Sequence, residues 1–402
     1  MKRSIYFFLY FSEGAPIGFI WWALPALLEK TGVSITEIAT LSAVATLPWT
    51  LKFLLAPMVD ILSLKFLKLK RQIFLYQLFM GISIFFVPMV MEQKELGLLT
   101  IVLIFHGFFA ALQDICIDAL AIRNVPAGET GKINGIMQAG MLVGRSILGG
   151  AGVFIAAKFG VPMLIYFLIS CIWISLIALQ RTSFEGAELP EIPVKKYALD
   201  FRNLIRSKRF WYLIGLTYFA CISYSGISTI SSAVLSEKGV PVIVHGVTYS
   251  IMIPVLMMTG ALFGGYLSDR KNSLSVLRIL IGTSIITSII AGTFVDYFVG
   301  IFALIGAFLL FYFFIGAVTA GLYGFLMKNT SKEFAALEYS VFMAFVNLSD
   351  TSASYLIGQL VENFSYISST CILGALCVIS FWFLALLKSG TTTAEISPSC
   401  GS

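Results

Sequence analysis

The chain has 402 residues, of which 58% are hydrophobic and only 12% are charged. Soluble proteins carry about a quarter charged residues, so this composition excludes an ordinary water-exposed surface. The net charge of +6 is assigned to the ends of membrane-spanning segments rather than to nucleic-acid binding, because so apolar a chain must sit in lipid. The six cysteines show no paired spacing, which predicts neither a disulfide framework nor a metal site.

Apolar segments recur along the whole chain. They are too long and too uniformly apolar for barrel strands, which predicts membrane-spanning helices. The first segment is predicted to be retained rather than cleaved as a signal peptide, because Glu13 interrupts it and no small-residue cleavage site follows. The predicted spans are 4–28, 36–58, 72–91, 99–122, 132–157, 161–180, 210–235, 245–267, 275–295, 298–327, 334–360 and 366–387.

The positions of Lys and Arg test this topology. With the N-terminus in the cytoplasm, most of the 27 basic residues fall on the cytoplasmic side, and only Lys30, Lys94, Lys158 and Lys238 fall on the other. This asymmetry is typical of a protein of the bacterial inner membrane. Both termini are therefore predicted to be cytoplasmic.

A polar stretch at residues 181–209 divides the chain into two halves. It predicts an N-terminal six-helix bundle over 1–180, a cytoplasmic linker over 181–209 and a C-terminal six-helix bundle over 210–388. The remaining residues, 389–402, are rich in Ser, Thr and Gly and are expected to form a disordered cytoplasmic tail.

The two halves carry matching loops after their second helix. Asp60 is followed by bases that include Arg71, and Asp269 is followed directly by Arg270. Such an internal repeat predicts an all-α membrane protein of twelve helices in two pseudo-symmetric bundles, the major facilitator architecture. We predict that Asp60, Arg71, Asp269 and Arg270 form a cytoplasmic gate; the alternative is simple anchoring at the interface.

Five ionisable residues fall inside predicted spans, where each charge costs at least a few kcal/mol and requires a reason. They are Glu13, Asp114, Asp118, Arg145 and Asp350. Glu13 lies among Gly and Pro residues that break a helix. The depths of Asp114 and Arg145 predict an ion pair, either fixed or exchanged for a proton or an anionic substrate group. Asp350 is predicted to line a cavity or bind a cation, and each residue has a structural alternative.

Aromatic side chains beside these charges are further candidates. Trp21 and Trp22 are expected to be membrane-interface or packing residues. The alternative, stacking on a ring-bearing ligand, places both in the predicted substrate pathway. His106 and His245 are expected to be packed or hydrogen-bonded. No Walker A sequence and no His-Glu-x-x-His motif is present, so neither ATP-driven transport nor metalloprotease chemistry is expected, and the chain is predicted not to be an enzyme.

Three stretches resemble one branch of the major facilitator superfamily. They are Tyr10-Phe11-Ser12-Glu13-Gly14-Ala15-Pro16, Leu47-Pro48-Trp49-Thr50-Leu51-Lys52-Phe53 and Gln113-Asp114-Ile115-Cys116-Ile117-Asp118. The branch is that of the AmpG-like permeases, which includes muropeptide and siderophore importers and, more distantly, acetyl-CoA transporters. Glu13 departs from the branch, since Gln is common there, and Arg145 is shifted by a position or two. The resemblance adds Gln113 to the predicted pathway.

Together these features predict a proton-coupled importer of an organic solute of siderophore or muropeptide type. A carboxylate that takes up a proton on one side and releases it on the other would couple transport to the gradient. The alternatives are an exporter or facilitator of another small molecule and, from another class, an intramembrane enzyme or a non-transporting receptor. We expect a monomer in the lipid bilayer, with no cofactor and no nucleic-acid partner.

Overall fold

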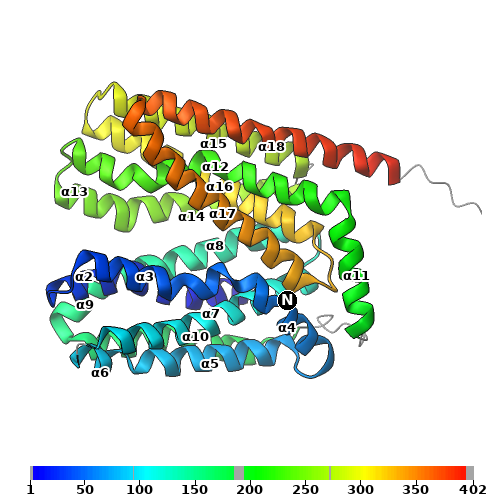
Figure 1. Ribbon diagram of the computed structural model, residues 1–402, viewed down its shortest axis with the longest axis horizontal. Helices are drawn as coiled ribbons and strands as arrows, with labels where there is room; N and C mark the ends of the chain where they lie inside the picture. The colour runs from blue at the N-terminus through cyan, green and yellow to red at the C-terminus, as the bar shows by residue number, and fades with distance from the viewer. Residues whose placement is uncertain (1–2, 94, 185–193, 271–272, 395–402) are drawn as a thin grey trace, which may run out of the picture. The chain divides into compact units, whose positions relative to one another are not determined.

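The computed structural model describes residues 3–93, 95–184, 194–270 and 273–394, and in these ranges all regular secondary structure is helical. The chain divides into two compact units (Figure 1). Unit 1 consists of Met1–Ile192 and Met327–Val341, and unit 2 of Pro193–Leu326 and Phe342–Ser402.

Unit 1 begins with one membrane-length segment made of α1 (Ser4–Gly18), the π-helical turn η1 (Phe19–Ala23) and α2 (Leu24–Lys30). The other elements are α3 (Ile35–Thr50), α4 (Lys52–Lys65), α5 (Leu69–Phe85), α6 (Val87–Glu92), α7 (Leu96–Asn124), α8 (Thr130–Ser146), η2 (Ile147–Ala151), α9 (Gly152–Phe159) and α10 (Val161–Gln180). A second π-helical turn, η2, lies between α8 and α9.

Unit 2 begins with an amphipathic helix, α11 (Val194–Arg206), inside the stretch predicted to be a linker. The last helix passes the predicted boundary at residue 388. The elements after α11 are α12 (Lys208–Glu237), α13 (Val242–Val247), η3 (Thr248–Met252), α14 (Ile253–Arg270), α15 (Ser273–Asp296), α16 (Ile301–Asn329), α17 (Ala335–Asn363) and α18 (Tyr366–Ala394). Residues 395–402 of the predicted tail lie outside the described residues.

The predicted membrane helices are present. Within the described residues, 11 segments are long and apolar enough to cross a bilayer. A further helix, α17, is equally long at 29 residues but carries more polar side chains, among them Ser349 and Asp350. An all-helical membrane fold is thus confirmed, and the protein is an integral membrane protein.

Glycines let two helices of unit 1 pack with their backbones in contact. A Cβ added at Gly14 or Gly18 of α1 would meet the backbone of α8, and one added at Gly140 or Gly144 of α8 would meet the backbone of α1. The Gly140–Gly144 pair of α8 thus packs directly against α1. Small residues at such interfaces allow close van der Waals packing where lipid supplies no hydrophobic driving force.

The same device recurs in unit 2 between α14 and α16. A Cβ added at Gly260 or Gly264 of α14 would meet backbone atoms of Phe313 or Ala317, and one added at Gly316 would meet the carbonyl of Met257. Each unit therefore contains one pair of helices locked together through reciprocal glycines.

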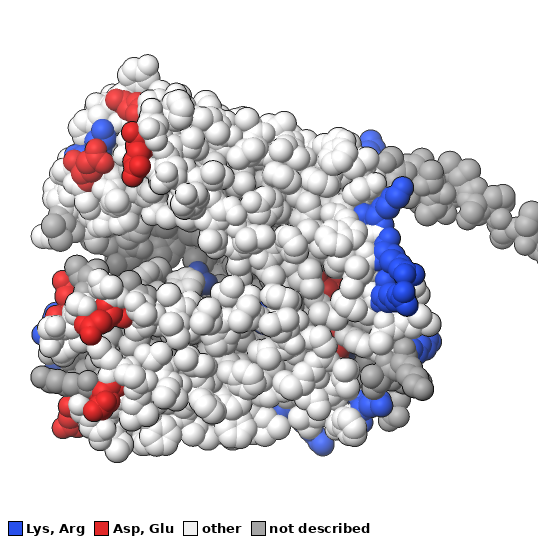
Figure 2. Space-filling view, viewed as in Figure 1, with Lys and Arg blue, Asp and Glu red and all other residues white. Residues whose placement is uncertain are grey.

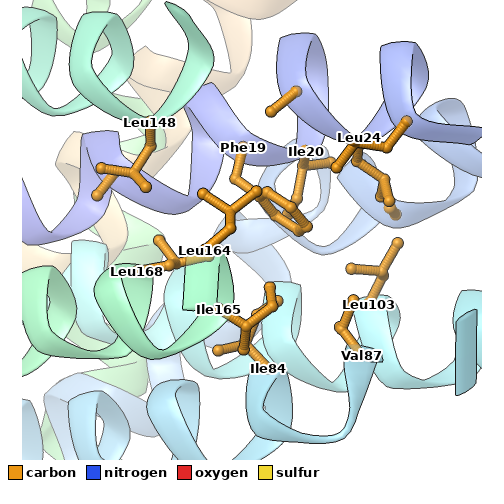
Figure 3. Packing of buried hydrophobic residues seen from close by; sticks show 14 of the residues in the cluster. Phe19, Ile20, Leu24, Ile84, Val87, Leu103, Leu148, Leu164, Ile165 and Leu168 are labelled. Carbon is orange, nitrogen blue, oxygen red and sulfur yellow. The ribbon is translucent and has the colours of Figure 1, made fainter. Parts of the chain in front are cut away.

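Behind the α1–α8 pair lies an apolar core of unit 1. Phe19 and Ile20 of η1, Leu148 of η2 and Leu164 and Ile165 of α10 belong to this one cluster of buried residues (Figure 3). All five side chains are almost completely buried. This core fixes η1 and η2, and with them the residues on their other faces.

Charged side chains gather at the ends of the helices in each unit. On the face shown in Figure 2, most of the Asp and Glu lie at one end and most of the Lys and Arg at the other, and few charged atoms lie in the wide band between them. This is the distribution that the asymmetry of Lys and Arg along the sequence predicts.

Candidate functional site

A cluster of charged side chains is buried inside unit 1 around Lys52. Lys52 is the first residue of α4, and Asp114 and Asp118 lie one turn apart on one face of α7. The Lys52 Nζ atom lies 2.6 Å from Oδ2 of Asp114 and 3.8 Å from Oδ2 of Asp118. All three side chains are less than a tenth exposed, so one ammonium group contacts two carboxylates in a site that is shielded from water.

Helix α1 adds two further groups to this cluster. The Tyr10 hydroxyl donates a 2.5 Å hydrogen bond to Oδ1 of Asp118. Glu13, one turn further along α1, is 3% exposed and interacts electrostatically with Asp114, Lys52 and Asp118. Among the described residues, no hydrogen bond reaches its buried Oε2 atom. We call Tyr10, Glu13, Lys52, Asp114 and Asp118 the unit 1 cluster.

The predicted pair between Asp114 and Arg145 is wrong, because the partner of Asp114 is Lys52. The backbone of Arg145 lies against Gly18 of α1, and its guanidinium sits over the ring of Trp21 at 5.3 Å from the centroid. The glycine packing of α8 on α1 therefore directs Arg145 toward η1. A matching depth in the membrane does not specify which helix face a side chain occupies.

The two tryptophans occupy η1. Trp21 is 44% and Trp22 is 47% exposed, and the ring of Trp22 packs where a side chain on Gly149 of η2 would lie. The π-helical turns shift the residues that follow them around the helix, and such turns are frequent at functional sites. Gln113 differs, since it is fully buried on α7 and neither of its side-chain polar atoms is hydrogen-bonded within the described part of the chain.

Asp60 on α4 forms a second buried group in unit 1. Its Oδ1 atom lies 2.9 Å from Nη2 of Arg123 and accepts a hydrogen bond from the backbone N–H of Ala336 at 3.2 Å. Its Oδ2 atom accepts from the N–H of Leu337 at 3.0 Å. Asp60 thus caps the N-terminus of α17, where free N–H groups and the helix dipole favour a negative charge.

The bases predicted for the gate lie elsewhere. Arg71 is exposed at the start of α5, and the basic partner of Asp60 is Arg123 at the end of α7. Asp60 pairs with Arg123 because α4 packs against α7. In unit 2, Asp269 is half-buried, and the guanidinium of Arg270 lies over the ring of Tyr266 at 4.6 Å.

Asp350 lies in unit 2 on α17, against α12. The Ser225 hydroxyl donates a hydrogen bond to Oδ1 of Asp350, and one turn further along both helices Thr229 and Ser354 hydrogen-bond at 2.7 Å. Polar pairs at two successive turns show that α12 and α17 run in parallel register here. Nearby, His245 contacts Ser232 through Nε2 at 3.1 Å and stacks on Tyr249.

Three residues of these sites were missed. Lys52 and Arg123 fall among the bases assigned to the cytoplasmic side, and Tyr10 is named only within the stretch 10–16 that carries the family resemblance. The signal for Lys52 was its position six residues inside the predicted span 36–58. For Arg123 the signal was weaker, because it directly follows the predicted span 99–122.

Comparisons with known proteins agree with this fold. The family model of the Major Facilitator Superfamily matches residues 6–348. An uncharacterized protein of Haemophilus influenzae is 31% identical over 162 residues, 39% of this chain and 37% of that protein. A protein described as putative transporter AmpG 1, from Rickettsia felis, is 28% identical over 140 residues, 33% of this chain and 31% of that protein. The chain thus aligns with less than half of each of these relatives.

Among solved structures, the fucose:proton symporter FucP of E. coli superposes with a TM-score of 0.73 at 13% identity, covering 96% of this chain and 97% of that one. At this identity the likeness shows the fold alone, whereas the family match covers most of the sequence. The family consists of secondary transporters rather than enzymes. The chain belongs to the Major Facilitator Superfamily.

Proposed function

We propose that this transporter is a proton-coupled importer of an organic solute in the bacterial inner membrane, working by alternating access. The unit 1 cluster carries the proposal. It brings three carboxylates, those of Glu13, Asp114 and Asp118, near the single ammonium group of Lys52. With Arg145 counted as well, the charges balance when one carboxylate holds a proton.

Glu13 is the proposed proton carrier of the cluster. Its Oε2 atom is buried, and within the described residues it accepts no hydrogen bond, which is costly for a charged oxygen but tolerable for a protonated carboxyl group. Lys52, bonded to Asp114, is proposed to move toward Glu13 when Glu13 loses its proton. The proton gradient would then act on the substrate site by changing the carboxylate that pairs with Lys52.

The substrate class comes from sequence similarity. Partial similarity to putative AmpG transporters and the resemblance of residues 10–16, 47–53 and 113–118 support a muropeptide or siderophore. Arg145, Trp21, Trp22 and Gln113 are proposed for the N-terminal part of the pathway, and Asp350 for the C-terminal part. We retain bundles over 1–180 and 210–388, joined by residues 181–209, as part of this proposal.

Uptake into proteoliposomes tests the proposal. A labelled ferric siderophore and a labelled anhydro-muropeptide are offered with and without an imposed proton gradient. We expect gradient-dependent accumulation of one of them, and we expect Glu13→Gln and Asp114→Asn each to abolish it. Full accumulation by both variants would remove the cluster from the coupling mechanism. Equal exchange without any gradient effect would favour the second candidate, a facilitator of another solute.

The contacts of Asp60 support a further part of the proposal, a latch at one membrane end. Asp60 holds both Arg123 and the N-terminus of α17, and the two elements are more than 200 residues apart in sequence. Release of α17 from Asp60 would open this end of the pathway. Substituting Asp60 with Asn should shift the labelling of engineered cysteines toward the state open at that end.

A further inference from the structure

A cavity lies at one membrane end of unit 1, between the start of α5 and the end of α10. Its volume is about 440 Å³, within the range of small-molecule sites. Leu67, Phe74, Leu75 and Leu179 supply its apolar lining, and Lys70 and Arg71 supply two positive charges. It lies outside the unit 1 cluster and plays no part in the proposed coupling.

The place of this cavity determines what can fill it. Leu69 begins α5 and Gln180 ends α10, and these are ends of two segments that are long and apolar enough to cross a bilayer. Lipid headgroups and the first carbons of the acyl chains occupy this depth of a bilayer. The apolar residues extend from the bases along α5 toward the hydrocarbon, as acyl chains do below a phosphate.

Lys70 is bound in place rather than extended into water. Its Nζ atom donates to the carbonyl of Gln180, the last residue of α10, at 3.3 Å and to that of Thr182, just beyond the helix, at 2.8 Å. An ammonium group has three donors, so one remains for an anion. The next residue, Arg71, is exposed, and its guanidinium group is suited to bidentate binding of phosphate.

We propose that this cavity binds an anionic phospholipid, with its phosphate between Lys70 and Arg71 and an acyl chain along Phe74 and Leu75. Because Lys70 also holds the end of α10, a bound lipid joins the two helices and stabilises unit 1. The proposal does not depend on which solute is transported.

Thermal unfolding of the purified full-length protein in detergent tests the proposal. The added ligands are phosphatidylglycerol, phosphatidylethanolamine and inorganic phosphate. Phosphatidylglycerol is expected to raise the midpoint more than phosphatidylethanolamine does, and inorganic phosphate is expected to have little effect. In Arg71→Gln the phosphatidylglycerol concentration for half effect should rise about fivefold, the loss expected for one base at a membrane surface. Arg71→Lys should lose less.

Arg181→Gln is the matched control, because Arg181 is exposed at the same membrane end but does not line the cavity. It should respond like the unsubstituted protein. A second variant, Leu75→Trp, fills the apolar part and should weaken the lipid effect without a change of charge. Equal losses in Arg71→Gln and Arg181→Gln, or equal effects of both lipids, would overturn the proposal. An effect of inorganic phosphate as large as that of phosphatidylglycerol would show a free anion to be the ligand.

Discussion

The two units bury carboxylates in different ways. In unit 1, Asp114 and Asp118 share the ammonium group of Lys52, and Asp118 also accepts from Tyr10. In unit 2, among the described residues, the carboxylate of Asp350 is bonded by one neutral group, the Ser225 hydroxyl. When the charged partner of a buried carboxylate is removed, the carboxylate is left as an unbalanced charge. When a hydroxyl that donates to a carboxylate is removed, the carboxylate loses only one hydrogen bond. The unit 1 cluster should therefore tolerate substitution far less than the surroundings of Asp350.

The largest effect is expected for Lys52→Met. Removing the Lys52 ammonium group leaves the carboxylates of Asp114 and Asp118 buried without this partner, which costs about 3–5 kcal/mol. The thermal unfolding midpoint should fall sharply, and transport should be lost. Lys52→Arg is the charge-preserving control, and Asp114→Asn added to Lys52→Met should restore part of the stability. An unchanged midpoint in Lys52→Met would contradict the comparison.

Asp60→Asn should have the next largest effect, about 2–3 kcal/mol, because Arg123 would lose its partner and the N-terminus of α17 its charged cap. The matched substitution in unit 2 is Asp269→Asn. Asp269 is half-buried where Asp60 is fully buried, so the expected loss is well under 1 kcal/mol. Thermal unfolding of both variants measures the difference. Equal losses of stability would show that Asp60 and Asp269 contribute equally to the stability of the protein.

Glycine packing offers a comparison in which the two units should behave alike. Gly14→Ala in unit 1 and Gly264→Ala in unit 2 each place a methyl group against a backbone carbonyl, and each should cost about 1–3 kcal/mol. Gly97→Ala and Gly306→Ala are the controls, since open space surrounds both helical positions. These controls should be neutral or slightly stabilising in thermal unfolding. A loss in one unit alone would show that its helix pair can separate slightly without unfolding.

The last test of the comparison concerns two hydroxyls that donate hydrogen bonds to carboxylates. Tyr10→Phe and Ser225→Ala each remove one hydrogen bond to a carboxylate, worth about 1–3 kcal/mol because the acceptor is charged. Tyr10→Phe should reduce gradient-driven accumulation more than exchange of substrate across the membrane. Ser225→Ala should instead change the substrate concentration for half-maximal uptake. Measuring both uptake modes for both variants separates coupling from binding, and identical profiles would argue against different roles.

The sequence predicted the membrane helices well for a local reason. Each helix satisfies its own backbone hydrogen bonds, so its limits depend on the hydropathy of its own residues. The predicted span 161–180 coincides with α10, and the predicted span 366–387 differs by one residue from the segment Tyr366–Lys388. The amphipathic helix α11 was missed, because it lies in a polar stretch where hydropathy gives no signal.

The candidate residues were found, but their partners were not. A charged residue inside an apolar span is recognisable from the sequence alone. For this reason the sequence identifies Glu13, Asp114, Asp118 and Asp350 as candidates. Lys52 and Arg123 lie near span ends, where a base is ordinary and is interpreted as a topology signal. No local pattern distinguishes a base that extends to water from one that turns inward.

By itself the sequence determined that the chain is a helical membrane protein, approximately where its membrane helices lie, and which residues are costly to bury. The tertiary structure decided which of those residues meet. Asp114 pairs with Lys52 because α4 and α7 are neighbours, and Arg145 turns to Trp21 because reciprocal glycines hold α8 on α1. Asp60 caps α17 across 276 residues of sequence. Helix formation in lipid is a local balance, whereas partner choice depends on how helices pack, which no single segment encodes.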